Sequence, residues 1–441
     1  MRFRRDGSWS RHGSLILAGS PLRVFRTTAA GTAVARRLES DDDVDASHLV
    51  DRLLDAGAIH PLPDPGRPPR FGTEDVTVVT PQYGPLSRGR ASAGDIHQDI
   101  HQDIHQHVHQ DIHRDVHDDG RLTIDDGTTP PLAGAAARLH TNAGPAAARN
   151  AARPLVRTAL VAFLDADVTV PPDLADWVQP LLWHFDDPTV ALVAPRVAGE
   201  NASPLDLGRE PARIRAGTRV SYVPGAALLV RVEALDAVGW FDPGLRFGED
   251  VDLVWRLDQA GWRCRFDPSI SVWHEPRSTW RARLRQHAGY GTSAAPLALR
   301  HPGALSPVQI NGWTAAAWLA VLGGHLATGV TIAVGSAAAL ERKLPGLPRR
   351  PSFELAMRGH LLAGQQLASA VRRVWWPLVA LGSLFSRRCR WLAVASVVAD
   401  PRSTPTDVAY GWGVWTGMFR HRTADPIIPR LRAWPGRTSS R

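Results

Sequence analysis

The feature that most constrains this chain is a series of short apolar runs separated by segments that can form helices. Runs of strand length lie at residues 76–79, 121–124, 160–164 and 190–194. This spacing predicts an α/β domain with a mainly parallel sheet. Polar residues follow the second and third runs, at the carboxyl ends of strands where open α/β sheets bind ligands.

Residues 1–70 have the composition of a separate small module. Residues 61–69 (PLPDPGRPP) are typical of a linker. The pattern before them predicts two short strands and two short helices, at 15–17, 22–25, 34–38 and 48–54. We interpret this part as a docking module rather than a second active site.

The α/β domain is predicted over residues 71–295, and a repeat of period four interrupts it at residues 95–119. In a helix the repeat would place six histidines on one stripe, namely His97, His101, His105, His109, His113 and His117. Histidines four residues apart can chelate a divalent metal. The regularity favours the alternative, a low-complexity expansion without a metal-binding role.

Residues 296–441 are predicted to form an apolar, arginine-flanked helical region. Residues 313–340 contain only His325 as an ionisable group, and they exceed the about 20 apolar residues that cross a bilayer. The runs 374–385 and 391–398 are shorter and fit interfacial helices. Because arginine clusters flank these runs, we expect attachment to anionic lipid at the cytoplasmic face of the membrane.

The charge balance favours anionic partners. The chain has 51 Lys and Arg against 43 Asp and Glu, a net charge of +8. This excess suits phosphates, nucleotides or anionic lipid, and it is too diffuse to indicate nucleic acid. Only Cys264 and Cys389 are present, which excludes a disulfide framework and favours a reducing compartment.

Two carboxylate groups follow predicted strands. Asp125 and Asp126, before Gly127, can accept hydrogen bonds from a nucleobase or ribose, although Asp-Gly is also an ordinary turn. Asp165 and Asp167 would point to the same side of an extended chain. That arrangement suits Mg²⁺ or Mn²⁺ shared with a diphosphate, and the alternative is a solvated strand end.

A third acidic group, Glu249 and Asp250, follows Gly248 at the predicted start of a helix. Acidic residues in the first turn of a helix interact favourably with the helix dipole, so one explanation for these residues is helix capping. The other, which the sequence supports equally, is that Asp250 acts as a general base.

A helix is predicted over residues 142–150, after a glycine turn. Its backbone N–H groups and Arg149 suit a phosphate. His274 follows a strand-like run at 270–273 and is either a structural histidine or a third metal ligand.

The order of these groups resembles the family 2 glycosyltransferases, which share the nucleotide-sugar-binding GT-A fold. The resemblance covers about residues 74–290 and is carried by TNAGPAAARN, VAFLDADV and FGEDVDLVWRLDQAGWRCRFDP. A narrower resemblance is to the mycofactocin-system glycosyltransferases, through HFDDPTVALVAPRV, YVPGAALLVR and YGTSAAPLALRHPG. Members of that group are understood to add glucose units to a peptide-derived redox cofactor.

The resemblance implies roles for the donor-side residues. Asp125 and Asp126 match the positions that hold uracil and ribose, and Asn150 follows Arg149 on the nucleotide-side helix. The resemblance also assigns the metal and diphosphate motif to Asp165 and Asp167. Asp167 is the implied direct ligand of the metal.

The resemblance further implies Asp250 as the catalytic base with Glu249 beside it, and His274 near a position that some GT-A enzymes use for metal. The implied reaction is the inverting, Mg²⁺- or Mn²⁺-dependent transfer of a hexose from a nucleotide sugar. UDP-glucose is the implied donor, and a hydroxyl of a mycofactocin-type acceptor is the implied acceptor.

The chain departs from the family where a leucine-rich helix usually follows the first strand. Residues 82–85 and the histidine repeat stand there instead, which predicts a poorly packed edge. Two alternatives stay open: a family 2 enzyme of cell-wall lipid or polysaccharide synthesis, and a metal-binding or scaffold protein built on the repeat.

Overall fold

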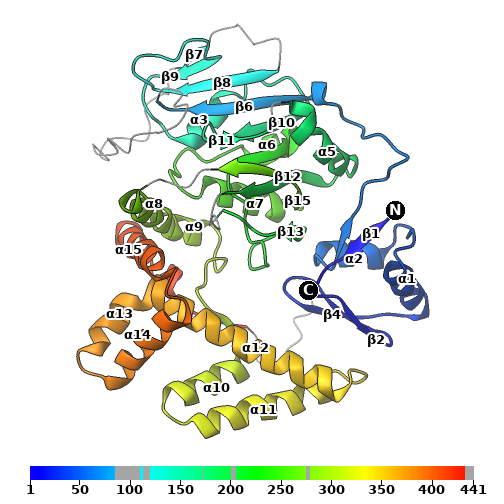
Figure 1. Ribbon diagram of the computed structural model, residues 1–441, viewed down its shortest axis with the longest axis vertical. Coiled ribbons are helices and arrows are strands. Elements are labelled where there is room, and N and C mark those ends of the chain that lie inside the picture. The colour runs from blue at the N-terminus through cyan, green and yellow to red at the C-terminus, as the bar shows by residue number, and fades with distance from the viewer. Residues whose placement is uncertain (85–109, 113–119, 172, 200–204, 275–278, 433–441) are drawn as a thin grey trace. The chain divides into compact units, whose positions relative to one another are not determined.

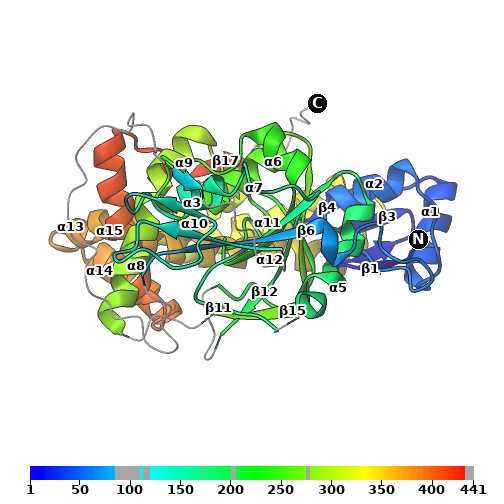
Figure 2. The ribbon, with the colours of Figure 1, turned by 90° about the horizontal axis from the view of Figure 1, so that it is seen from above.

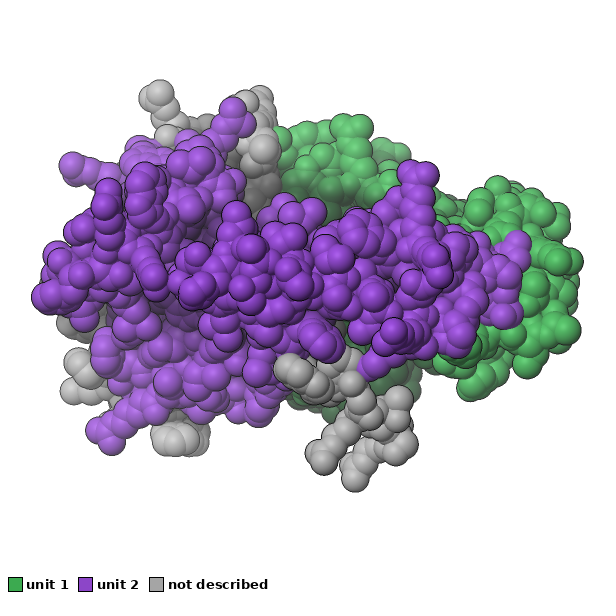
Figure 3. Space-filling model, turned by 90° about the horizontal axis from the view of Figure 1, so that it is seen from below, with its two compact units in different colours: residues 1–10, 16–276 green, residues 11–15, 277–441 purple. Residues whose placement is uncertain are grey.

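The chain forms two compact units. The computed structural model describes residues 1–84, 110–112, 120–171, 173–199, 205–274 and 279–432. Residues 1–10 with 16–276 make up the first unit, and residues 11–15 with 277–441 make up the second (green and purple in Figure 3).

A ten-stranded sheet forms the centre of the first unit (Figure 1). Its strands are β6 (Val76–Gln82), β7 (Gln110–Ile112), β8 (Arg121–Asp126), β9 (Ala137–Leu139), β10 (Leu160–Leu164), β11 (Val168–Thr169), β12 (Val190–Ala198), β13 (Ala212–Ile214), β14 (Ala227–Arg231) and β15 (Arg263–His274). Their order is β11-β15-β12-β14-β10-β6-β8-β9-β7, with β13 on β15. Strands β6, β8, β9, β10, β12 and β15 run in one direction, and β14 opposes both of its neighbours. The predicted α/β class is confirmed.

The four predicted strands are confirmed, and three of them are longer than predicted. The run at 160–164 has the predicted bounds, whereas β8 extends through the aspartate pair and β12 extends to Ala198. Strand β6 continues through Pro81 to Gln82, although a proline at this place favours a strand end. Pairing with β10 stops at Val79, so Pro81 lies beside β8 alone, where a missing N–H costs little.

Helices pack on this sheet and bury its apolar side chains. They are α3 (Pro145–Ala151), α4 (Leu174–Trp177), α5 (Gln179–Leu182), the 3₁₀ turn η2 (Trp183–Asp186), α6 (Val232–Val238) and α7 (Glu249–Gln259). The core includes Val78, Leu160, Trp177, Leu181 and Leu229. The first strand is therefore well packed on this side, while the segment after residue 84 lies outside the described residues.

The N-terminal module has its own core around Ile16, Phe25, Leu38 and Leu53. Its elements gather at one end of Figure 2. They are β1 (Phe3–Arg5), β2 (Ser10–His12), β3 (Leu15–Ala18), β4 (Arg23–Arg26), α1 (Ala29–Glu39), α2 (His48–Asp55) and β5 (Ile59–Pro61). The strands and helices predicted here are confirmed, and β1, β2 and β5 are additional.

The second unit is largely helical. Its elements are α8 (Trp280–Thr292), α9 (Ala294–Arg300), β16 (Gln309–Asn311), α10 (Gly312–Leu322), α11 (Leu326–Lys343), α12 (Arg349–Ala370), the π-helical turn η3 (Val371–Trp375), α13 (Trp376–Ser383), α14 (Arg387–Ala399), α15 (Thr404–His421), the 3₁₀ turn η4 (Asp425–Ile427) and β17 (Arg430–Arg432). The apolar stretch 313–340 is divided between α10 and α11, which pack on each other. In the described part of the chain, no helix combines the length and apolarity needed to cross a bilayer.

Most of the histidine repeat lies outside the described residues. Its residues 110–112 form β7, which pairs antiparallel with β9. These three residues are extended and not helical, and the six histidines of the stripe lie outside the described residues.

Candidate active site

A buried arginine joins two of the predicted acidic groups. Arg149 lies on α3, and its side chain is only 1% exposed. Its Nη2 donates to Asp165 Oδ1 at 2.6 Å, and its Nη1 donates to Glu249 Oε1 at 2.9 Å. Asp165 follows β10 and Glu249 opens α7. One guanidinium therefore connects the Asp-x-Asp motif with the Gly-Glu-Asp motif.

Two residues that the sequence did not single out complete the surroundings of Arg149. The carbonyl oxygen of Gly225 accepts a hydrogen bond from Nη2 at 3.2 Å, and the guanidinium carbon lies 5.0 Å from the centre of the Phe241 ring. A Cβ atom at Gly225 would lie 2.9 Å from Arg149 Nη2. A side chain there would push the guanidinium away from the carboxylates that hold it, which favours glycine, and the only signal in the sequence is the small-residue turn before an apolar strand.

Asp250 is held by two backbone N–H groups. Gly225 N–H donates to Oδ2 and Val251 N–H donates to Oδ1, both at 2.8 Å. Gly248, at φ 79°, lets the chain turn sharply into α7. Glu249 and Asp250 therefore share the first turn of the helix and face the Arg149 cluster.

The positive charge of Arg149 acts on three carboxylates, those of Asp165, Glu249 and Asp250. Burial raises the pKa of Glu249 to about 7, and the negative charge of Asp250 adds to that rise while Arg149 opposes it. Burial also raises the pKa of Asp250 and of Asp165, again against the effect of Arg149. Glu249 can therefore exchange a proton near neutral pH, and the pKa of Asp250 beside it is raised in the same direction, which suits general base catalysis.

The two aspartates of the Asp-x-Asp motif have different partners. The motif forms a turn closed by Val168 N–H to the Asp165 carbonyl at 3.1 Å, so the expectation of an extended chain with both side chains on one side is wrong. Asp165 contacts Arg149, whereas Asp167 Oδ2 lies 3.4 Å from His274 Nε2. The register explains this pairing, because Val168 on β11 is opposite His274 on β15.

Asp167 and His274 offer donors that a divalent cation accepts. The Asp167 side chain is 55% exposed and the His274 side chain 13%. Among the described residues, no three His, Cys, Asp or Glu side chains gather closely enough to hold a metal ion. A carboxylate oxygen suits Mn²⁺, and an imidazole nitrogen is a common ligand of divalent transition-metal ions. These two side chains would hold such a cation, and the protein itself offers no third ligand among the described residues.

Asp125 and Asp126 are used within the protein. Asp125 accepts hydrogen bonds from the N–H groups of Thr128 and Leu132, at 2.8 and 3.1 Å. Asp126 accepts from Ala143 and Gly144, at 2.8 and 3.0 Å, just before α3. Burial raises the pKa of Asp126 to about 6 despite these bonds. Both residues shape the loops beside α3, and their contact with a nucleotide stays a prediction.

Asn150 fixes the segment that precedes α7. Its Nδ2 donates to the Phe241 carbonyl at 2.7 Å, and Phe241 N–H donates back to Oδ1 at 3.1 Å. Asn150 therefore ties α3 to the loop before Gly248. The predicted contact of Arg149 with a phosphate also stays a prediction, since the observed acceptors of Arg149 are two carboxylates and the Gly225 carbonyl.

Comparison with known proteins decides the family. The model of "Glycosyltransferase like family 2" matches residues 135–290. The "Pre-mycofactocin glycosyltransferase" of Mycobacterium tuberculosis is 35% identical, and the match covers 95% of each chain. The chain is a family 2 glycosyltransferase. Its α/β domain is the GT-A domain that the sequence predicted, and within the family the chain is close to the mycofactocin-system enzymes.

Other relatives of this family 2 glycosyltransferase are more distant. The "Succinoglycan biosynthesis protein ExoA" of Rhizobium meliloti is 31% identical over 109 residues, which are 22% of this chain and 33% of that protein. A solved structure of the mannosyltransferase PcManGT from Pyrobaculum calidifontis, in complex with GDP-Man and Mn²⁺, is 16% identical. That match covers 82% of this chain and 89% of the other, with a TM-score of 0.42.

Proposed function

We propose that this glycosyltransferase transfers a hexose from a nucleotide sugar to an acceptor hydroxyl with inversion of the anomeric centre, in a metal-dependent reaction. The observation that carries the proposal is the single guanidinium of Arg149, which joins Asp165 to Glu249. The donor-side motif and the Glu249-Asp250 motif thereby belong to one site.

Asp250 is the general base of this mechanism. The N–H groups of Gly225 and Val251 fix the orientation of its carboxylate, and its remaining lone pairs accept the proton of the acceptor hydroxyl. The hydroxyl oxygen bonds to the anomeric carbon as the bond from that carbon to the diphosphate oxygen breaks. Attack from the face opposite the leaving group inverts the centre.

Asp167 and His274 are the residues that would hold the divalent cation. When bound, the cation neutralises negative charge that develops on the leaving diphosphate. Asp165, held by Arg149 at 2.6 Å, positions the turn from which Asp167 projects.

The donor and acceptor proposals rest on the relative's printed name and on the family resemblance. The relative that is 35% identical is named as a glycosyltransferase of pre-mycofactocin. We assign a mycofactocin-type, peptide-derived acceptor to this chain on that basis, with UDP-glucose as the donor.

The test is release of the nucleotide from a panel of nucleotide sugars, with and without Mn²⁺. We expect UDP release from UDP-glucose that increases with Mn²⁺ and with acceptor. In Asp167→Asn the response to Mn²⁺ should fall by about tenfold or more, while a variant of an aspartate outside the site, Asp236→Asn, should respond like the wild type. If no donor is consumed under any condition, the proposal is wrong.

We propose further that the second unit attaches to the cytoplasmic face of the membrane through the hairpin of α13 and α14. Leu384 and Phe385, between the two helices, are 70% and 85% exposed. Arg387, Arg388 and Arg390 follow directly. Exposed apolar side chains next to basic groups are typical of surfaces that insert into an anionic bilayer interface.

Vesicle sedimentation tests the attachment. We expect the protein to sediment with phosphatidylglycerol vesicles and to stay in solution with phosphatidylcholine vesicles. Replacing Leu384 and Phe385 by serine removes apolar area that binds the interface, and should weaken binding by about tenfold or more. Phe419→Ser is the matched control, because Phe419 is 76% exposed outside the hairpin. Equal binding of the hairpin variant and the control would rule out the hairpin.

A further inference from the structure

A cavity of about 450 Å³ lies between the N-terminal module and the sheet, within the first unit. Its module side is formed by α2 and β5, and its other walls by η2, β13 and the first half of β15. Val190 at the start of β12 pairs with Arg263 at the start of β15. Asp165 follows the end of β10, which runs in the same direction. The cavity therefore lies towards the amino ends of the parallel strands, whereas the candidate active site lies at their carboxyl ends.

The lining combines an apolar wall with a cluster of cations. The apolar part includes Leu54, Ile59, Pro61, Trp183 and Phe266. Among the described residues of the lining, Asp267 is the only acidic one, against five arginines, namely Arg4, Arg209, Arg213, Arg263 and Arg265. A cavity of this volume and composition is typical of sites for small organic ligands.

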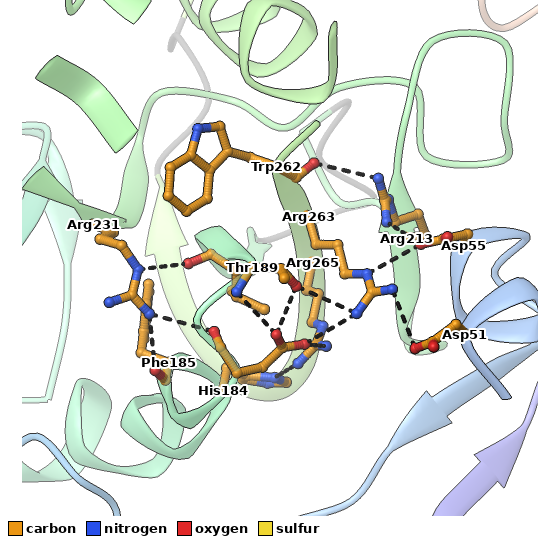
Figure 4. Close-up of polar contacts among 12 residues, drawn as sticks. Asp51, Asp55, His184, Phe185, Thr189, Arg213, Arg231, Trp262, Arg263 and Arg265 are labelled. Atoms are coloured by element: carbon orange, nitrogen blue, oxygen red, sulfur yellow. Dashed lines mark hydrogen bonds and ion pairs between the residues drawn. The ribbon is translucent and has the colours of Figure 1, made fainter. Parts of the chain in front are cut away.

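Carboxylates outside the lining fix Arg263 and Arg265 in place. Arg263 extends from β15 to Asp55 at 3.1 Å and to Asp51 at 3.6 Å, both on α2 (Figure 4). Arg265 and Arg263 share one further carboxylate, that of Asp187, at 2.7 and 3.5 Å. These contacts hold the guanidinium groups without any ligand, so the site is preorganised.

Arg265 is a largely buried cation that shares the Asp187 carboxylate with Arg263. Its side chain is 11% exposed, and burial together with the charges of Arg263 and Arg213 lowers its pKa to about 10. The Nε–H of Arg213 is buried and has no hydrogen-bond acceptor among the described residues. An anion in the cavity would add negative charge beside Arg265, which otherwise shares one carboxylate with Arg263.

A flat surface lies beside these cations. The rings of Trp183 and His184 stack with centres 3.7 Å apart, at 28°. His184 Nε2 lies 2.8 Å from Asp267 Oδ2, and the other ring nitrogen of His184, Nδ1, lies 3.4 Å from Arg265 Nη1. This chain of contacts satisfies Asp267 within the protein. We propose that the cavity binds a small organic anion, with an aromatic or other flat apolar body and a phosphate or carboxylate group.

Calorimetry on the full chain tests this with three probes. 2-Naphthyl phosphate has both features, 2-naphthol has only the ring, and inorganic phosphate has only the charge. We expect 2-naphthyl phosphate to bind with a Kd below about 1 mM and each of the other probes at least about tenfold more weakly. Equal binding of 2-naphthol would overturn the role of the arginines.

Two variants locate the binding. Ala212 lines the cavity, so Ala212→Phe fills it, and we expect affinity for 2-naphthyl phosphate to fall about tenfold or more. Arg209→Glu reverses a charge on an exposed lining residue without disturbing a core, and should also weaken binding. Arg153→Glu is the control, since Arg153 is an exposed arginine outside the lining. Unchanged binding in both cavity variants would overturn the proposal, because the probe would then bind elsewhere.

Discussion

In the Asp250→Asn variant, we expect the rate of sugar transfer to fall by about a thousandfold while affinity for the nucleotide is retained. The asparagine oxygen can still accept a hydrogen bond from Gly225 N–H, so the start of α7 keeps its position. The amide cannot take a proton from the acceptor hydroxyl. The measurements are kcat from nucleotide release, and the Kd for UDP from calorimetry.

The control for this prediction separates catalysis from helix capping. Glu233 is the second residue of α6, as Asp250 is the second residue of α7. If Asp250 only stabilises the helix dipole, Asp250→Asn and Glu233→Gln should both lower the melting temperature slightly and leave kcat within about threefold. A selective loss of kcat in Asp250→Asn is the outcome that supports a base.

The pattern of apolar runs was sufficient to predict the strands, because buried strands of a sheet need continuous apolar residues. The bounds of β10 and the start of α7 after Gly248 follow directly from the sequence. Strands β1, β2 and β5 were not predicted, since each has only three residues. Such short segments pair through the backbone and carry little periodicity.

The site residues could be named from the sequence, but their partners could not. The Asp-x-Asp motif was expected to be extended, and a turn places Asp165 on Arg149 and Asp167 on His274. Both contacts join residues more than fifteen positions apart in the chain, so no local pattern reveals them. Gly225 was missed for the same reason, because the preference for glycine there comes from the Arg149 side chain.

Replacing Arg149 by methionine should shift the pH dependence of catalysis as well as lower the rate. The positive charge of Arg149 lowers the pKa of Asp165, Glu249 and Asp250, so its removal raises all three. The base is then protonated over a wider range, and the acidic limb of the kcat profile should move to higher pH. Activity lost at neutral pH should be partly recovered in alkaline buffer.

The variant should also be less stable, because Arg149→Met leaves buried carboxylates without their cation, at a cost of about 3 kcal/mol or more. Arg149→Lys keeps the charge but loses the two-pronged contact, so it should fold better and show a smaller pH shift. Arg153→Met, in the turn after α3, is the control with an exposed ion pair.

If Arg149 contacts only the diphosphate of the donor, the Arg149→Met and Arg149→Lys variants should both give a different result. The Kd for UDP would rise, and the pH at half-maximal kcat would stay where it is in the wild type. A positioning role requires a nearly constant Kd with a displaced pH profile, since Arg149 then acts through Asp165 and Glu249.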